Sequence, residues 1–237
     1  MTSDPELLED PRLRNKRFVF EDRTHAGILL AERMKEYEGK DAFLFAIPAG
    51  GVPVAVVLAK RLHLPVDILV IRKIHIPWNR EAGFGALSWD GTLFFNELLL
   101  NHLGLRGEEV ERCIEEEKKE IEKRLTMFRR AKPFPDISGK TVIVVDDGLA
   151  SGFTMLVAAS SLKKQGPKEI IVSVPTASTS AIDLISTEVD RIFCLNIRGG
   201  RTFAVADAYH NWYDLGNEDV VRILNEAGYY ETQDFIR

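Results

Sequence analysis

Apolar residues recur along this chain with two different spacings. Continuous apolar runs are typical of strands that are buried on both faces, and they occur at 42–47, 66–71, 141–145, 170–174 and 191–197. Apolar residues three or four positions apart predict helices at 52–62, 108–130, 154–165, 180–186 and 218–227. Strands separated by helices favour a mostly parallel, twisted α/β sheet flanked by helices on both faces.

The segments outside this alternation predict further features. Residues 1–17 are polar and indicate a loosely ordered arm in front of a single domain at 18–237. Thr24 is expected to cap the first helix, which ends before Gly39. Residues 86–95 predict a β-hairpin with its turn at Asp90 and Gly91.

Composition narrows the class of protein. With 237 residues, 45% of them hydrophobic and 28% charged, the chain is typical of a globular protein. A net charge of −5 argues against a broad nucleic-acid-binding face. The apolar runs are too short to span a bilayer and the first residues lack a signal-peptide core, so we expect a cytoplasmic protein without membrane contact. Cys113 and Cys194 lack a metal-binding spacing and are expected to be reduced thiols.

The segment 144–154, VVDDGLASGFT, carries the most informative chemistry. It follows a predicted strand and leads into a helix, and its small residues let backbone N–H groups approach an anion. Asp146 and Asp147 would repel a phosphate, but carboxylates accept hydrogen bonds from sugar hydroxyls or organise Mg²⁺. The alternative is an ordinary turn with a hydroxyl cap.

Three other segments are candidates for the same site. Residues 47–53 (IPAGGVP) form a glycine-rich connection between a strand and a helix, which either binds a second anion or is only a connection. Arg72 and Lys73 follow a strand, either as a solvated basic pair or as an anion contact. The aromatic segment 198–213 contains Phe203, which either stacks on a flat heterocycle or belongs to the core.

The 146–154 segment resembles the signature of type I phosphoribosyltransferases, two acids followed by a loop ending Thr-Gly-x-Thr, with Ser151 in place of the first Thr. The resemblance implies a flexible-loop hairpin at about 72–96, a small hood at about 196–237 and a homodimer. It also implies that phosphoribosyl pyrophosphate (PRPP) is a substrate and that Asp146 and Asp147 lie at the ribose 2′- and 3′-hydroxyls. Mg²⁺ would be held by these acids mainly through ribose hydroxyls or water. The 5′-phosphate site would comprise Gly148, Ala150, Ser151, Gly152, Phe153 and Thr154.

The same resemblance implies roles for the other segments. The loop with Ala49, Gly50 and Gly51 would bind pyrophosphate, often through a strained or cis peptide, together with Arg72. Lys73 would be catalytic, and Phe203 would stack on a nucleobase-like acceptor. Poorly characterised phosphoribosyltransferases similar to this chain usually read Pro-Arg-Gly-Gly where it has Ala49, so one phosphate-binding guanidinium is missing.

The function implied by the resemblance is transfer of the 5-phosphoribosyl group from PRPP to a nitrogen nucleophile, with release of pyrophosphate. Two alternatives remain open at this point. One is a module that binds PRPP or a nucleotide without turnover, and the other is a hydrolase or phosphorylase of a related phosphorylated sugar.

Overall fold

The computed structural model describes residues 5–130, 132–200 and 202–231. Its main feature is a six-stranded parallel sheet in the order β1-β9-β8-β7-β2-β3. The strands are β1 (Glu6–Leu8), β2 (Ala42–Ala46), β3 (Val66–Ile68), β7 (Thr141–Val145), β8 (Glu169–Ser178) and β9 (Arg191–Arg198). The predicted α/β class and parallel sheet are therefore confirmed.

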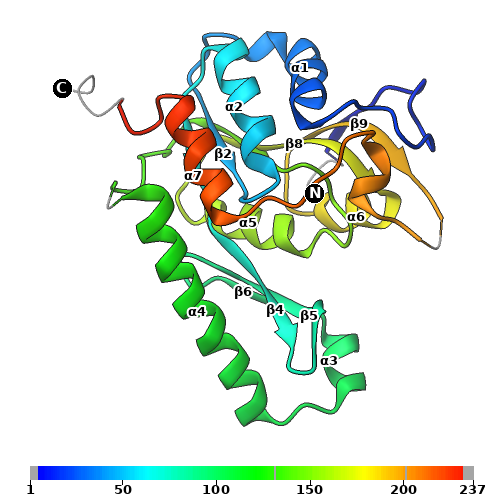
Figure 1. Ribbon diagram of the computed structural model, residues 1–237, viewed down its shortest axis with the longest axis vertical. Coiled ribbons are helices and arrows are strands. Elements are labelled where there is room, and N and C mark those ends of the chain that lie inside the picture. The colour runs from blue at the N-terminus through cyan, green and yellow to red at the C-terminus, as the bar shows by residue number, and fades with distance from the viewer. Residues whose placement is uncertain (1–4, 131, 201, 232–237) are drawn as a thin grey trace.

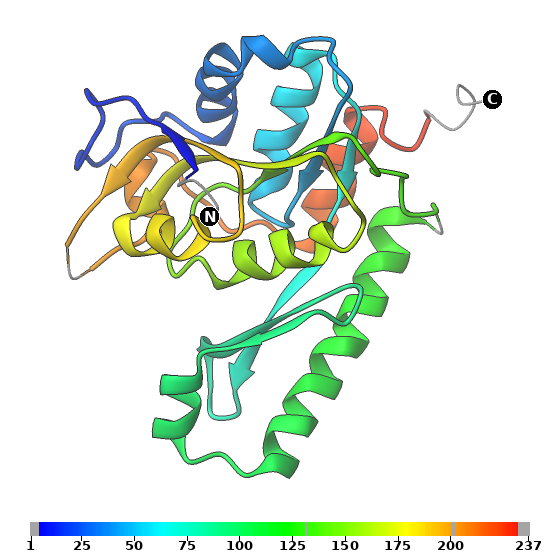
Figure 2. The ribbon, with the colours of Figure 1, turned by 180° about the vertical axis from the view of Figure 1, so that it is seen from behind.

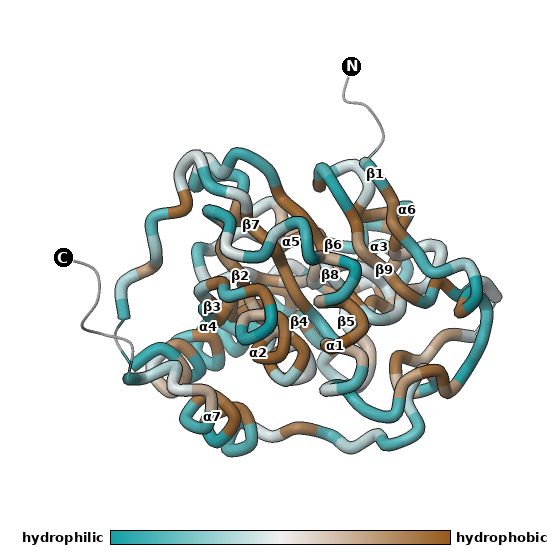
Figure 3. The backbone as a smooth tube through the Cα atoms, turned by 90° about the horizontal axis from the view of Figure 1, so that it is seen from above, coloured by the Kyte–Doolittle hydropathy of each residue, from teal (hydrophilic) through white to brown (hydrophobic). Residues whose placement is uncertain are grey.

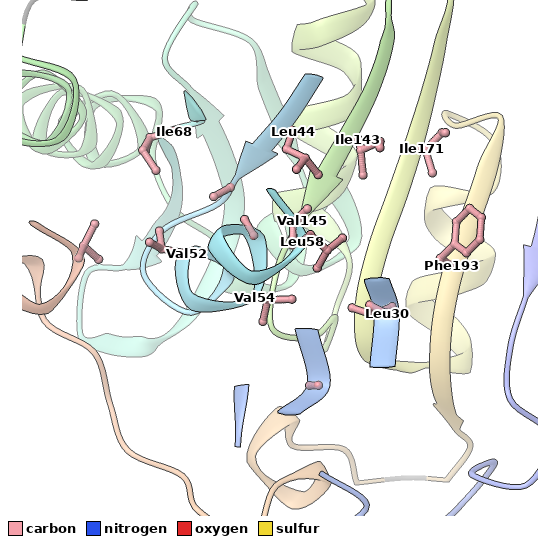
Figure 4. Packing of buried hydrophobic residues seen from close by; sticks show 14 of the residues in the cluster. Leu30, Leu44, Val52, Val54, Leu58, Ile68, Ile143, Val145, Ile171 and Phe193 are labelled. Carbon is pink, nitrogen blue, oxygen red and sulfur yellow. The ribbon is translucent and has the colours of Figure 1, made fainter. Parts of the chain in front are cut away.

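Helices cover both faces of this sheet (Figures 1 and 2). α1 (Arg23–Arg33) and α2 (Gly51–Leu62) lie on one face, and α5 (Phe153–Lys163) and α6 (Thr179–Ile185) lie on the other. Along β7, Ile143 and Val145 belong to the first core, whereas Val142 and Val144 belong to the second. Figure 4 shows the first core, in which Leu30 and Leu58 meet the sheet. Burial on both faces explains why the strands have continuous apolar sequences.

A second, antiparallel sheet projects from the main body beside a long helix (Figure 1). It contains β4 (Ile71–Ile76), β5 (Asn79–Ser88) and β6 (Leu93–Phe95), and is followed by α3 (Glu97–Leu103) and α4 (Gly107–Arg129). The β5–β6 turn contains Asp90, whose side chain accepts from the Thr92 amide, and Gly91 with φ +84°, so the predicted hairpin is confirmed. The single strand expected at 66–71 is wrong, because the chain leaves the parallel sheet after Ile68 and pairs elsewhere from Ile71.

Two expectations at the start of the chain are also wrong. Part of the expected loose arm, Glu6–Leu8, is an edge strand that pairs in parallel with β9. The first helix is capped by Asp22, not Thr24, because the Asp22 side chain accepts from the His25 amide at 2.8 Å. That helix ends at Arg33, and a 3₁₀ turn at Lys35–Tyr37 precedes Gly39.

The last elements close the fold around the sheet. They are a 3₁₀ turn at Val205–Ala208 and α7 (Asn217–Glu226), which packs against α2 and α4. Figure 3 shows the hydrophobic positions concentrated on the central strands and hydrophilic positions on the outer turns. The described part of the chain has no helix long and apolar enough to cross a membrane.

Candidate functional site

The candidate site lies at the carboxyl end of β7, where loops of a parallel sheet commonly bind ligands. Gly152, with φ +81°, ends the loop and directs the chain into α5, so the positive end of that helix points at the loop. The loop is fixed to β8, because the Leu149 amide donates to the Thr176 carbonyl and the Ser178 hydroxyl donates to the Ala150 carbonyl. The structure therefore holds the predicted 5′-phosphate segment as an ordered turn before a helix.

The two acids at the start of this loop are in a low-dielectric environment. The Asp147 residue is only 8% exposed, and its backbone amide donates to Asp146 Oδ1 at 2.8 Å. Burial, together with the adjacent Asp147 carboxylate, raises the pKa of Asp146 well above its usual range. Burial also raises the pKa of Asp147, and the neighbouring Arg23 opposes that shift. Both carboxyls are therefore held in a place where losing a proton is unfavourable.

The glycine-rich loop after β2 lies directly against these acids. A Cβ on Gly50 would lie 1.9 Å from Asp147 Oδ2, and a Cβ on Gly51 would lie 2.5 Å from the Val145 carbonyl oxygen. The peptide between Pro48 and Ala49 is cis, as the resemblance led us to expect for this loop. The structure thus brings the two predicted loops together in one site.

Sequence reasoning missed two residues that contact Asp147. Arg23 Nε donates to Asp147 Oδ2 at 2.8 Å across 124 residues of sequence. The Tyr209 hydroxyl donates to the Asp147 backbone carbonyl at 2.6 Å, and this side chain is 1% exposed. The aromatic character of 198–213 was a signal for Tyr209, whereas nothing near Arg23 marked it as a partner of the acids.

Three residues predicted to belong to the site make contacts away from the two acids. Arg72 Nε donates to Glu117 of α4 at 2.8 Å, and the exposed Lys73 has its side chain over Gly83. Phe203 lies under the Arg198 guanidinium, 4.3 Å from the ring centroid. The pyrophosphate role of Arg72, the catalytic role of Lys73 and the base-stacking role of Phe203 stay predictions.

The donor set suits a magnesium ion that arrives with its substrate. Among the described residues, no group of three or more His, Cys, Asp or Glu side chains could form a metal cage. Mg²⁺ commonly keeps several waters and is held by one or two carboxylates plus substrate phosphates. Asp146 and Asp147 fit this kind of binding, in which the protein contributes only part of the coordination.

Comparison with known proteins identifies the family. A family model described as a phosphoribosyl transferase domain matches residues 90–208, just over half of the chain. A Mycobacterium tuberculosis (strain H37Rv) protein named "Putative phosphoribosyl transferase" is 31% identical over 209 residues, which are 88% of this chain and 47% of that protein. This chain therefore spans about half the length of that curated relative.

A solved structure shares the fold of this chain. The crystal structure of TT1426 from Thermus thermophilus matches with a TM-score of 0.70 and 32% identity, over 87% of this chain and 98% of that one. A ribose-phosphate pyrophosphokinase of Thermococcus kodakarensis is 40% identical over 63 residues, 26% of this chain and 22% of that protein. On the family match, and with the acidic loop at the end of β7, the chain belongs to the phosphoribosyl transferase family.

Proposed function

We propose that this protein transfers the 5-phosphoribosyl group of PRPP to a nitrogen nucleophile, in the first instance a nucleobase, and releases pyrophosphate. The observation that carries the proposal is that two adjacent acids, the buried Asp147 and the half-buried Asp146, lie beside two small-residue loops at the carboxyl end of β7. Acids that bind sugar hydroxyls and amides that bind phosphates are both needed for a phosphorylated ribose.

Each part of the site has a role in this proposal. Asp146 and Asp147 bind the ribose hydroxyls. The 5′-phosphate binds to the loop and the first turn of α5, through Gly148, Ala150, Ser151, Gly152, Phe153 and Thr154. Pyrophosphate binds to the loop after β2 through Ala49, Gly50 and Gly51, with support from Arg72 and Lys73, and Phe203 stacks on the acceptor.

The chemistry is mainly positioning and charge stabilisation. The bond between ribose C1′ and pyrophosphate breaks, the acceptor nitrogen bonds to C1′, and the nitrogen loses its proton to solvent. Positive charge develops on the ribose during this exchange, and in this proposal the Asp146 and Asp147 carboxylates stabilise it. Mg²⁺, when bound, supplies charge neutralisation of the departing pyrophosphate.

The test is pyrophosphate release from PRPP and Mg²⁺ over a panel of purine and pyrimidine bases. We expect release that depends on one acceptor or one acceptor class. The variant with both Asp146→Asn and Asp147→Asn is expected to lose this release and to remain folded, as circular dichroism would show. Full activity in that folded double variant would disprove the mechanism, and ribose 5-phosphate formation without an acceptor would instead indicate a hydrolase.

The second candidate is a module that binds PRPP or a nucleotide without turnover. Two observations favour it. Ala49 supplies no guanidinium, and the Arg72 side chain donates its hydrogen bond to Glu117, not to Asp146 or Asp147. Calorimetric binding of PRPP without release under any acceptor would establish this function. The expected homodimer and cytoplasmic location belong to the same proposal, and sedimentation of the purified protein tests the dimer.

A further inference from the structure

Arg23, the first residue of α1, lies between the acidic pair and the segment 209–213. Its Nε donates to Asp147 Oδ2 at 2.8 Å, and its Nη1 donates to the Tyr213 carbonyl at 2.9 Å. The residue is only 5% exposed, so this contact between charges is shielded from water. The proposed function uses Asp147 and gives Arg23 no role.

The guanidinium is held by its surroundings as well as by the acid. Its central carbon lies 3.9 Å from the centroid of the Trp212 ring, a distance at which a cation is attracted to an indole face. The segment that carries Trp212 is itself fixed beside α1, because the His210 amide donates to the Phe20 carbonyl at 2.8 Å. Arg23 is therefore an oriented donor rather than a freely moving cation.

Asp147 has little freedom to turn away from this donor. The Gly50 backbone packs so closely against its carboxylate that an added Cβ would lie 1.9 Å from Oδ2. The carboxylate is thus bounded by Gly50 and by Arg23, and its backbone carbonyl is fixed by the Tyr209 hydroxyl. A carboxylate fixed in this way presents its remaining acceptor capacity in a set direction.

The charge balance of the site gives this orientation a purpose. Two adjacent carboxylates next to phosphate-binding loops would repel an anionic ligand. The Arg23 guanidinium neutralises Asp147, so that the acidic pair carries one net negative charge when both acids are ionised. Asp147 can then accept a sugar hydroxyl without adding to the repulsion of the phosphates.

We propose that Arg23 is a positioning residue, which orients and neutralises Asp147 so that the acidic pair can accept the hydroxyls of an anionic sugar phosphate. The proposal rests on the proposed function for the identity of that ligand. Trp212 takes part by holding the guanidinium over its ring.

The first test is independent of any ligand. Crystal structures of the wild-type protein, Arg23→Gln and Arg23→Lys, all without ligand, are compared at the Asp147 side chain. Because Arg23→Gln removes the charged donor that holds Oδ2, we expect the Asp147 carboxylate to leave its wild-type orientation in that variant. Arg23→Lys, which keeps the charge but not the planar fork, should give a smaller displacement.

The second test separates positioning from a merely structural ion pair. Arg23→Gln is expected to raise the KM for PRPP by at least about tenfold, with partial recovery in Arg23→Lys. Arg129→Gln is the matched control, since Arg129 forms an equally buried ion pair with Asp67 at 2.7 Å. This pair joins α4 to β3 and does not involve the acidic loop. In Arg129→Gln we expect neither the KM nor the orientation of Asp147 to change.

The outcomes decide separately on Arg23 and on the proposed function. An unchanged orientation of Asp147, or an unchanged KM, in folded Arg23→Gln overturns the positioning role. If that variant does not fold, equality of Arg23→Lys with wild type overturns it. If wild type releases no pyrophosphate, the transferase proposal fails but the Arg23 proposal does not. The dissociation constant for PRPP then replaces the KM when the variants are compared with wild type. Wild-type protein that does not bind PRPP at all overturns both proposals.

Discussion

Substitution of Gly50 by alanine isolates the contact between the two loops of the site. Gly50 has φ −63° and ψ −34°, a backbone conformation that alanine adopts readily, so any effect comes from the added methyl group. That methyl carbon would lie 1.9 Å from Asp147 Oδ2, 2.3 Å from Cγ and 2.7 Å from Oδ1. The carboxylate must therefore move by about 1.5 Å before ordinary contact begins at 3.4 Å.

Such a shift would break the ion pair between Asp147 and Arg23, whose atoms now lie 2.8 Å apart. Loss of one partner of a buried ion pair costs about 3–5 kcal/mol, and we expect Gly50→Ala to lose stability toward the lower end because both charges remain present. Displacement of a reacting or binding group by about 1 Å reduces activity on the order of 100-fold.

The assay combines urea unfolding, followed by circular dichroism, with PRPP-dependent pyrophosphate release. Gly107→Ala is the control, because Gly107 begins α4 and an added Cβ there has no neighbour within 4 Å. The control is expected to gain at most about 1 kcal/mol, with no change in release. If Gly50→Ala matched wild type in both measurements, the close packing of this loop against Asp147 would be refuted.

Three further predictions concern single side chains. The pKa of Asp146 in the folded protein is raised above 3.8, so the contribution of this carboxyl to stability falls as pH rises from about 4 upward. Asp146→Asn should therefore be more stable than wild type at pH 8 and similarly stable at pH 4. A difference in the free energy of urea unfolding that stays constant with pH would contradict this. Tyr209→Phe leaves the buried Asp147 carbonyl without its 2.6 Å donor, and should lose about 1–3 kcal/mol in thermal unfolding with α-helical content unchanged. Arg72→Gln removes the 2.8 Å partner of Glu117 and should lose about 1–3 kcal/mol; a simultaneous rise in the KM for PRPP is the result that the pyrophosphate role requires.

The strands and most helices could be predicted because their signals are local. β7 and β8 are covered on both faces, and this burial produces short continuous apolar runs rich in Val and Ile. The strand boundary at Ile68 was missed because Ile71 is equally apolar; it pairs with Ser88 in another sheet, and a run of apolar residues does not identify the partner strand. The edge strand Glu6–Leu8 was missed for a related reason, since its polarity reflects a half-exposed edge and its pairing with β9 is long-range.

In the candidate site, too, the features that are local in sequence could be predicted and the long-range contacts could not. The acids, the small-residue loop and the start of α5 are contiguous in sequence, and the structure shows the predicted order of strand, loop and helix around them. Arg23 contacts Asp147 across 124 residues of sequence, so this contact could be recognised only in the folded structure, where α1 lies at the end of β7. Arg72 shows the opposite case, because its position after a strand suggested an anion contact while α4 supplied a buried acid, Glu117.

The structure gives the paired glycines after β2 a reason other than anion binding. Neither Gly50 nor Gly51 has a positive φ, so backbone freedom is not the reason for glycine at these positions. Both are required by close approach, Gly50 to the Asp147 carboxylate and Gly51 to the Val145 carbonyl. This packing holds whether or not an anion binds, and the glycines alone therefore do not support a pyrophosphate site. What supports it is the position of the loop beside the acids. The effect of Arg72→Gln on the KM for PRPP therefore carries more information about pyrophosphate than a substitution of either glycine. Such a substitution would also displace the Asp147 carboxylate or the backbone at Val145.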